Sequence, residues 1–189
     1  HQFHVALDYA GGKLEKKQAY TDYLLAREPA PASGKLHDAP WLIPAPPDLS
    51  KRDGRPALAI FEQKVCAGCD EMHAEGFPRP EVAALLKRFR AARVDIAANE
   101  VLKTPNGKSL AMREWARQLK IAYTPSFVFF DASGREVFRV EGYLRPFHLA
   151  SSLDYVASGA YRKQPEFQRF IEARAAARRA QGEKIELMK

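Results

Sequence analysis

Four short apolar segments constrain the fold of this chain more than any other feature of its sequence. Helical patterns separate the segments at 57–62 and 93–99, whereas a short turn at 132–135 joins the segments at 126–131 and 136–143. A strand followed by a helix and another strand crosses over and pairs in parallel, and two strands joined by a tight turn pair antiparallel. We therefore expect an α/β fold with a mixed central sheet of four or five strands and helices on both faces.

The segments between the strands carry apolar residues at helical spacing. One helix is expected to begin at the cysteine pair that follows the first strand, and a second at Pro80, a residue that suits the first turn. The third is expected to begin after a turn at 104–108, with Ser109 as its N-cap, and the fourth to cover 145–161. The first strand thus delivers the cysteines to the carboxyl edge of the sheet, a common place for a site in such folds.

The chain is expected to divide into an N-terminal extension (1–54), a core domain (55–163) and a basic C-terminal helix and tail (164–189). Phe167, Phe170 and Ile171 share one face of the C-terminal helix, and a basic run follows them. In one interpretation, the start of this helix docks on the core domain and its end lies in solvent. A helix that binds a partner is the other.

The N-terminal extension has three predicted parts. Residues 3–9 alternate apolar and polar and indicate a strand, and residues 12–27 indicate a helix. Prolines interrupt residues 28–48, so this segment cannot form a regular helix or a central strand. We expect it to be an extended surface connector that Trp41, Leu42 and Ile43 hold in place.

The net charge of +7 comes from basic residues that are interleaved with acidic ones rather than gathered in one block. This distribution does not favour nucleic-acid binding, although a basic surface suits an acidic protein partner. No apolar run reaches the length of a membrane span. Because the chain begins at His1, we expect an exported, periplasmic protein whose signal peptide has been removed.

The only two cysteines, Cys66 and Cys69, lie three residues apart. A zinc site needs further ligands, of which only His73 is near, and haem attachment needs a histidine where Asp70 stands. A structural disulfide across so short a loop stabilises the fold weakly. The position favours a reactive dithiol, because a helix N-terminus stabilises the thiolate of Cys66 and so lowers its pKa.

Thr124 and Pro125 stand directly before the third strand of the core. A proline cannot donate a hydrogen bond to a sheet, so its presence there indicates a special role, such as a cis peptide bond in a tight turn. A trans proline that merely begins the strand is the alternative.

The motif Cys-Ala-Gly-Cys after an apolar strand, followed about sixty residues later by YTPSFVFFD, resembles the thioredoxin superfamily. The longer segments at 106–131 and 140–170 resemble the SoxW-type thioredoxin-related proteins of bacteria. The resemblance covers roughly residues 55–170, and the first fifty residues lie outside it.

This resemblance implies a thioredoxin-like fold and a thiol-disulfide oxidoreductase that reduces exported partner proteins. Cys66 is then the nucleophile, Cys69 the resolving thiol, and the two form a disulfide during the reaction. Thr124 and Pro125 face the dithiol, with a cis bond, and dock the substrate. The resemblance implies no cofactor; the partners are a protein thiol or disulfide and an external thiol that donates electrons.

The sequence departs from ordinary thioredoxin around the cysteines. Val65 replaces a tryptophan, Ala67-Gly68 replaces Gly-Pro, and Ile60 stands where thioredoxin has a buried aspartate. These changes affect the redox potential and the choice of partner, and Glu62 is a candidate substitute for the missing acid.

Lys64 and His73 are further candidates for tuning the dithiol. Lys64 lies two residues before Cys66, and His73 lies four residues after Cys69, on the same helical face. Two other classes stay open at this point. A copper or redox-metal chaperone could use the thiolates, which select Cu(I), and a redox-switched binding module could use the dithiol only to change conformation.

Overall fold

The computed structural model describes residues 2–26 and 32–185. The chain forms two compact units, residues 1–31 and residues 32–189. The boundaries expected at residues 54 and 163 stay predictions.

The first unit is helical, and the strand predicted at 3–9 is wrong. Helix α1 covers Gln2–Gly11, a short 3-10 turn covers Leu14–Lys16, and α2 covers Tyr20–Leu25. A lone strand here would leave its backbone groups without a partner, whereas a helix satisfies them internally. The predicted helix over 12–27 is also interrupted, and its last residue lies outside the described part. The ring of Tyr9 packs against Tyr20 and Tyr23, which holds the two helices together.

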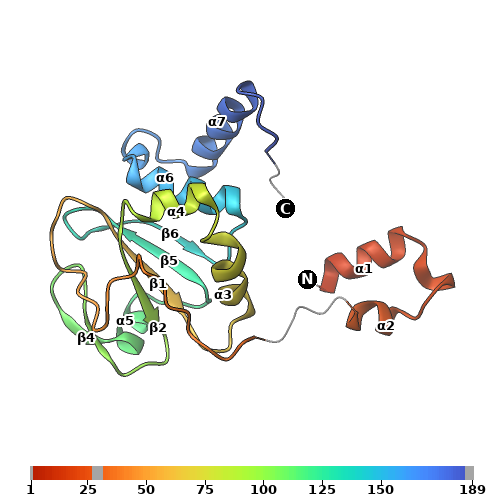
Figure 1. Cartoon of the computed structure of the whole chain (residues 1–189), viewed down its shortest axis with the longest axis horizontal. Coiled ribbons are helices and arrows are strands. Elements are labelled where there is room, and N and C mark those ends of the chain that lie inside the picture. Colours follow the sequence, from red (N-terminus) through yellow and green to blue (C-terminus); the bar gives the residue numbers. More distant parts are fainter. Residues whose placement is uncertain (1, 27–31, 186–189) are drawn as a thin grey trace. The chain divides into compact units, whose positions relative to one another are not determined.

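The second unit is built on a four-stranded sheet in the order β2-β1-β5-β6 (Figure 1). Its strands are β1 (Ala57–Glu62), β2 (Arg90–Asp95), β5 (Ser126–Phe130) and β6 (Glu136–Glu141). Strand β1 pairs in parallel with β2 and antiparallel with β5, and β5 pairs antiparallel with β6. The expected mixed sheet is confirmed, with four strands.

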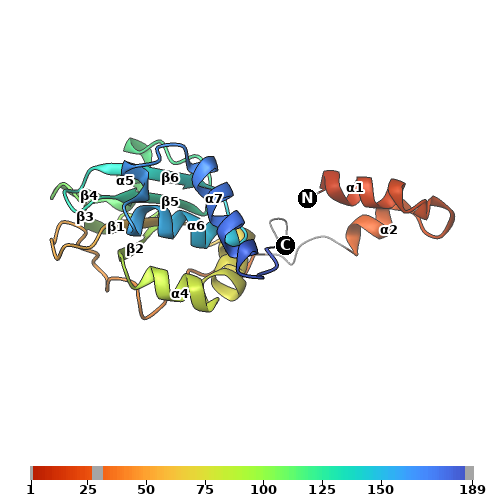
Figure 2. The same ribbon diagram turned by 90° about the horizontal axis from the view of Figure 1, so that it is seen from above.

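Helices cover both faces of this sheet, as predicted (Figures 1 and 2). On one face Leu58 and Ile60 pack against the π-helical turn η2 (Met72–Gly76), α4 (Pro80–Leu86) and α6 (Pro146–Ala157). Helix α3 (Ala67–Glu71) directly precedes η2. On the other face Ala59 and Phe61 pack against α5 (Met112–Gln118). The side chains of β1 alternate between the two faces and both are buried, which is why its sequence is a continuous apolar run.

Two details of the core differ from the sequence prediction. Strand β2 begins three residues earlier than the expected 93–99, because Arg90 pairs with Ala57 and sends its buried side chain to the backbone carbonyl of Leu49. Ser109 is not an N-cap. It lies in β4 (Ser109–Ala111), which pairs with β3 (Val101–Lys103) across the turn at 104–108, and α5 begins after Ala111.

The proline-rich connector lies against the second unit, as predicted for the residues from 32 onward. Trp41 packs edge-on against Phe77. Leu42 bridges to Ala91 and the Ile43 N–H donates to the Ala91 carbonyl, so the connector covers the free edge of β2.

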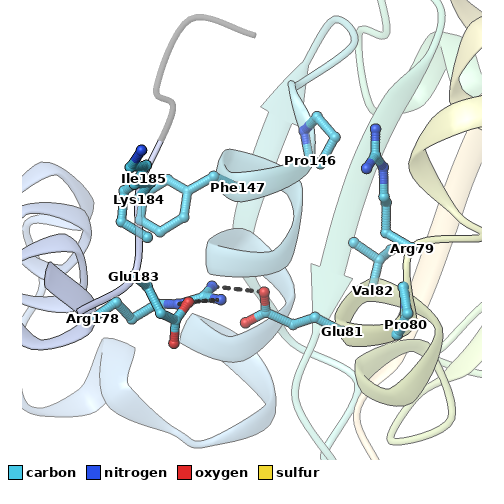
Figure 3. Close-up of a pocket in the computed structure, with 10 residues that line it drawn as sticks. All are labelled: Arg79, Pro80, Glu81, Val82, Pro146, Phe147, Arg178, Glu183, Lys184 and Ile185. Carbon is cyan, nitrogen blue, oxygen red and sulfur yellow. Dashed lines mark hydrogen bonds and ion pairs between the residues drawn. The ribbon is translucent and has the colours of Figure 1, made fainter. Parts of the chain in front are cut away.

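The start of the C-terminal helix is docked on the domain. Helix α7 (Phe167–Ala180) follows a short 3-10 turn (Ala160–Arg162), buries Ile171 and Ala175, and packs Phe167 against Phe138. Figure 3 shows Arg178 between Glu81 of α4 and Glu183, with nitrogen–oxygen distances of 2.7 Å and 2.5 Å. Within residues 2–26 and 32–185, no helix is both long and apolar enough to cross a bilayer.

Because Ile171 is buried against the domain, we expect Ile171→Ala to lower the free energy of unfolding by about 2–3 kcal/mol. Arg179→Ala is the matched control, since Arg179 is exposed on the same helix and its replacement should change stability by less than about 0.5 kcal/mol. Urea unfolding followed by circular dichroism measures both. Equal small effects would show that α7 contributes little to the domain.

Candidate redox site

The two cysteines lie after β1, at the start of α3, and they form a disulfide with an S–S distance of 2.03 Å. Cys66 has extended backbone and is the N-cap residue of α3. Its Sγ accepts a hydrogen bond from the Cys69 N–H at 3.1 Å. The same N–H also donates to the Cys66 carbonyl at 3.0 Å, so the sulfur and the carbonyl share this donor. The contact from the first turn of the helix would also stabilise a Cys66 thiolate.

The cysteines differ in their access to solvent and in their surroundings. Cys66 is 7% exposed and Cys69 is 2% exposed. Lys64, Val65 and Ala67, which flank Cys66, are exposed, whereas Cys69 precedes the buried Met72 by one turn. A partner from solution therefore reaches Cys66 first.

The segment Thr124-Pro125 lies against the dithiol loop. The Thr124–Pro125 peptide bond is cis, and Pro125 is buried at the start of β5. A Cβ atom at Gly68 would lie 3.3 Å from Cδ of Pro125 and 3.7 Å from Cβ of Tyr143. The absence of a side chain at Gly68 thus allows the two loops to approach closely. The structure thus brings Pro125, which Thr124 precedes, to the loop between Cys66 and Cys69.

Glu62, the last residue of β1, is a buried acid on the same sheet face as Leu58 and Ile60. Its side chain is 1% exposed. The His73 Nε2 lies 2.9 Å from its Oε1, and its Oε2 has no hydrogen-bond partner within the described residues. Burial of a carboxylate is costly unless it is hydrogen-bonded, so the pairing with His73 stabilises Glu62 in this position.

A second imidazole–carboxylate pair lies beside the first. The His37 ring stacks on the His73 ring with centroids 4.7 Å apart, and its Nε2 lies 2.6 Å from Oδ1 of Asp70. The backbone N–H and the hydroxyl of Ser33 also donate to the Asp70 carboxylate, both at 2.7 Å. Asp70 directly follows Cys69, so the connector is attached to the helix that carries Cys69.

The third tuning candidate, Lys64, forms no ion pair within residues 2–26 and 32–185, and its tuning role stays a prediction. In the same residues no three His, Cys, Asp or Glu side chains are gathered closely enough to hold a metal ion.

Residues 47–157, more than half of the chain, match the family described as thioredoxin-like domain. The chain belongs to this family. No curated protein sequence matches it.

The chain is similar to several solved structures, of which the first named here shows the same fold. A thioredoxin-fold protein from Helicobacter pylori is 18% identical, with a TM-score of 0.63, over 72% of this chain and 94% of that one. A thioredoxin from Thermus thermophilus is 30% identical over 55% of this chain and 74% of that one, with a TM-score of 0.43. The periplasmic thioredoxin SoxS from Paracoccus pantotrophus is 19% identical over 56% of this chain and 99% of that one, with a TM-score of 0.40. The thioredoxin-like fold expected from the sequence is thereby confirmed.

Sequence reasoning missed three residues around the site of this thioredoxin-like domain. His37 and Ser33 lie more than thirty residues before Asp70, and nothing in a proline-rich stretch marks them as its partners. Tyr143 lies against Gly68 and Gly76, and burial together with nearby Glu71 raises the pKa of Tyr143. Each contact depends on the folded topology rather than on local spacing.

The hydrogen bonds from His37 and from Ser33 lower the pKa of Asp70 from 3.8 to about 2. A carboxyl group whose pKa is lower in the folded state stabilises the fold above its unfolded pKa. This contribution is lost as pH falls from about 4 toward about 2. We expect the free energy of unfolding of Asp70→Asn to fall less over that pH range than that of the unmodified protein. Urea unfolding at several pH values measures this difference.

Asp38→Asn is the control for this measurement, because the Asp38 carboxylate is exposed on the same connector. Its free energy of unfolding should depend on pH as that of the unmodified protein does. If Asp70→Asn shows the same pH dependence too, the bonds to Asp70 do not contribute to acid sensitivity.

Proposed function

We propose that this protein is a thiol-disulfide oxidoreductase in which Cys66 attacks and Cys69 resolves. The observation that carries the proposal is the Cys66–Cys69 disulfide at the N-terminus of α3, next to the cis Thr124–Pro125 bond. The exposed residues on both sides of Cys66, Val65 and Ala67, and the deeper burial of Cys69 support these roles, because a partner must reach the nucleophile from solution.

The reaction is a pair of exchanges. The Cys66 thiolate attacks one sulfur of a substrate disulfide, and the other substrate sulfur leaves as a thiolate. Cys69 then loses its proton and attacks Cys66, so the Cys66–Cys69 bond forms and the second substrate sulfur leaves. The substrate gains two electrons, and an external thiol must reduce Cys66–Cys69 again.

Substrate docking is assigned to the backbone of Thr124 and Pro125 and to two exposed apolar side chains. Thr124 has no backbone hydrogen bond within the described residues, so its polar groups are free to pair with an extended substrate segment. Val65 precedes Cys66 and Tyr123 precedes Thr124, and both side chains are exposed. Apolar surface in such a position suits a partially unfolded or extended protein substrate.

Glu62, His73 and Lys64 are proposed to tune the dithiol. Glu62 and His73 form a buried acid–base pair one helical turn from Cys69, and Lys64 is a nearby exposed cation. We also propose that the protein is exported to the periplasm, belongs to the SoxW type and acts without a cofactor on protein partners. These proposals rest on the sequence resemblance.

The cysteine roles are tested by single replacements. Cys66→Ser should abolish the reduction of insulin disulfides with dithiothreitol as donor, because no nucleophile remains. Cys69→Ser should attack normally but stop at a mixed disulfide, which intact-mass spectrometry detects. Full activity in Cys66→Ser would contradict the proposal. Tight binding of one Cu(I) per reduced protein, without reductase activity, would instead support a copper chaperone.

The docking surface is tested with Tyr123→Ser. We expect KM for a protein disulfide to rise about tenfold, equivalent to about 1.4 kcal/mol, while the rate with a small aromatic disulfide stays unchanged. Val101→Ser is the matched control, because Val101 is also an exposed apolar residue but lies on β3. If the two replacements have equal effects, Tyr123 has no special part in docking.

A further inference from the structure

Two histidines and two carboxylates form one cluster beside the resolving cysteine. Glu62 comes from β1, His73 from η2, Asp70 from α3 and His37 from the connector. Exposure of the side chains increases along the cluster, from 1% for Glu62 and 9% for His73 to 33% for His37. The cluster therefore extends from the buried end of β1 to the surface.

The His73 ring is held from two sides. The His37 ring stacks on one face at an interplanar angle of 28°, and the Phe77 ring meets it edge-on with centroids 4.9 Å apart. With the ring fixed in this way, Nε2 lies 2.9 Å from Oε1 of Glu62, and an imidazole that carries a proton on Nε2 donates to this oxygen. The other oxygen, Oε2, has no partner within the described residues and stays free to accept a proton.

His37 is itself firmly held. The Asp70 carboxylate binds its Nε2, and the Arg93 guanidinium donates to its backbone carbonyl. Two elements of the domain, α3 and β2, therefore fix a residue that precedes both in the sequence. A surface histidine with no further role does not need contacts on its ring face, its ring nitrogen and its backbone.

The resolving step needs an acceptor for one proton. Cys69 must lose its thiol proton before its sulfur attacks Cys66, and at 2% exposure Cys69 is shielded from bulk water. His73 follows Cys69 by four residues, about one helical turn, and its partner Glu62 is a buried carboxylate at the end of β1 whose Oε2 has no partner within the described residues. We assign to this oxygen the role of accepting the proton. The substrate sulfur leaves with the electron pair and is later protonated from solvent.

We propose that His37 is a positioning residue of the redox site: stacked on His73 and anchored by Asp70, it holds the His73 ring against Glu62 and so keeps Glu62 ready to accept the proton of Cys69. This inference rests on the proposed function. His37 does not take the proton itself, because its Nε2 faces Asp70, and two stacked rings share no hydrogen bond.

Other charged groups surround this cluster and set the background for any pH dependence. Asp95 on β2 is the register partner of Glu62 and accepts a hydrogen bond from the Ala97 N–H. Arg93 on β2 pairs with Asp38 of the connector. These groups stay in place when His37 is replaced, but the bond from His37 to Asp70 is lost. His37→Ala and His37→Phe both lose that bond, so a difference between their pH profiles reports on the ring contact with His73.

The test follows formation and decay of the mixed disulfide by acid quench and mass spectrometry, from pH 5 to pH 9. A buried carboxylate that loses its hydrogen-bond donor is harder to ionise. His37→Ala should therefore slow resolution about tenfold at pH 7 and move the rising limb of its profile to higher pH. Glu62→Gln, which removes the acceptor, should slow resolution about a hundredfold. Attack by Cys66 should keep its rate in both variants.

His37→Phe separates positioning from a change in overall structure. It keeps a ring on His73 but loses the bond to Asp70, as His37→Ala does. We therefore expect resolution faster than in His37→Ala but slower than in the unmodified protein. His148→Ala is the control, because His148 is a partly exposed histidine that packs on Phe147 instead. It should change neither step.

Three outcomes would overturn the role of His37: unchanged resolution in His37→Ala, equal slowing in His37→Phe and His37→Ala, or unchanged resolution in Glu62→Gln. Failure of the unmodified protein to form any mixed disulfide would instead contradict the proposed function. The attack step, measured in the same samples, distinguishes the two cases.

Discussion

The pairing of β1 on both of its edges is the constraint on which the rest of the structure depends. Parallel pairing with β2 and antiparallel pairing with β5 place the end of β1 beside the start of β5. Phe61 thus lies opposite Ser126, so the dithiol that follows β1 meets the Thr124-Pro125 segment that precedes β5. The site is a direct consequence of two strands that run in opposite directions in the centre of the sheet.

The parts of the fold with local or periodic signals could be predicted from the sequence. The apolar run at 57–62, the short turn before β6 and the helical spacing around Val82 determine the mixed sheet and its covering helices. The start of β2 could not be placed, because its position depends on the distant loop that binds Arg90. The alternation at 3–9 was misleading, since apolar residues at every second position do not make a strand where no sheet is available to receive it.

The candidate site also contains residues that the sequence marks and residues that it does not. Cys66, Cys69 and Pro125 are marked by residue type and spacing, and Glu62 and His73 by their nearness to the cysteines. The partners of Asp70, Ser33 and His37, carry no such mark, because they lie in the connector and contact Asp70 only in the folded chain. A proline-rich stretch that reads as a spacer therefore contributes an imidazole to the surroundings of the dithiol, and it holds the Cys69 helix through a single carboxylate.

The contact between the connector and β2 also affects how the protein behaves among its own copies. A sheet whose edge strands offer free N–H and carbonyl groups invites the strands of other molecules to pair with it. Here Ile43 and Leu42 occupy part of the β2 edge. The opposite edge, β6, has charged residues at three of its six positions, Glu136, Arg139 and Glu141. Under the proposed function, extended substrate chains are thus limited in their pairing along the edges of the sheet, while the Thr124 backbone stays open to them.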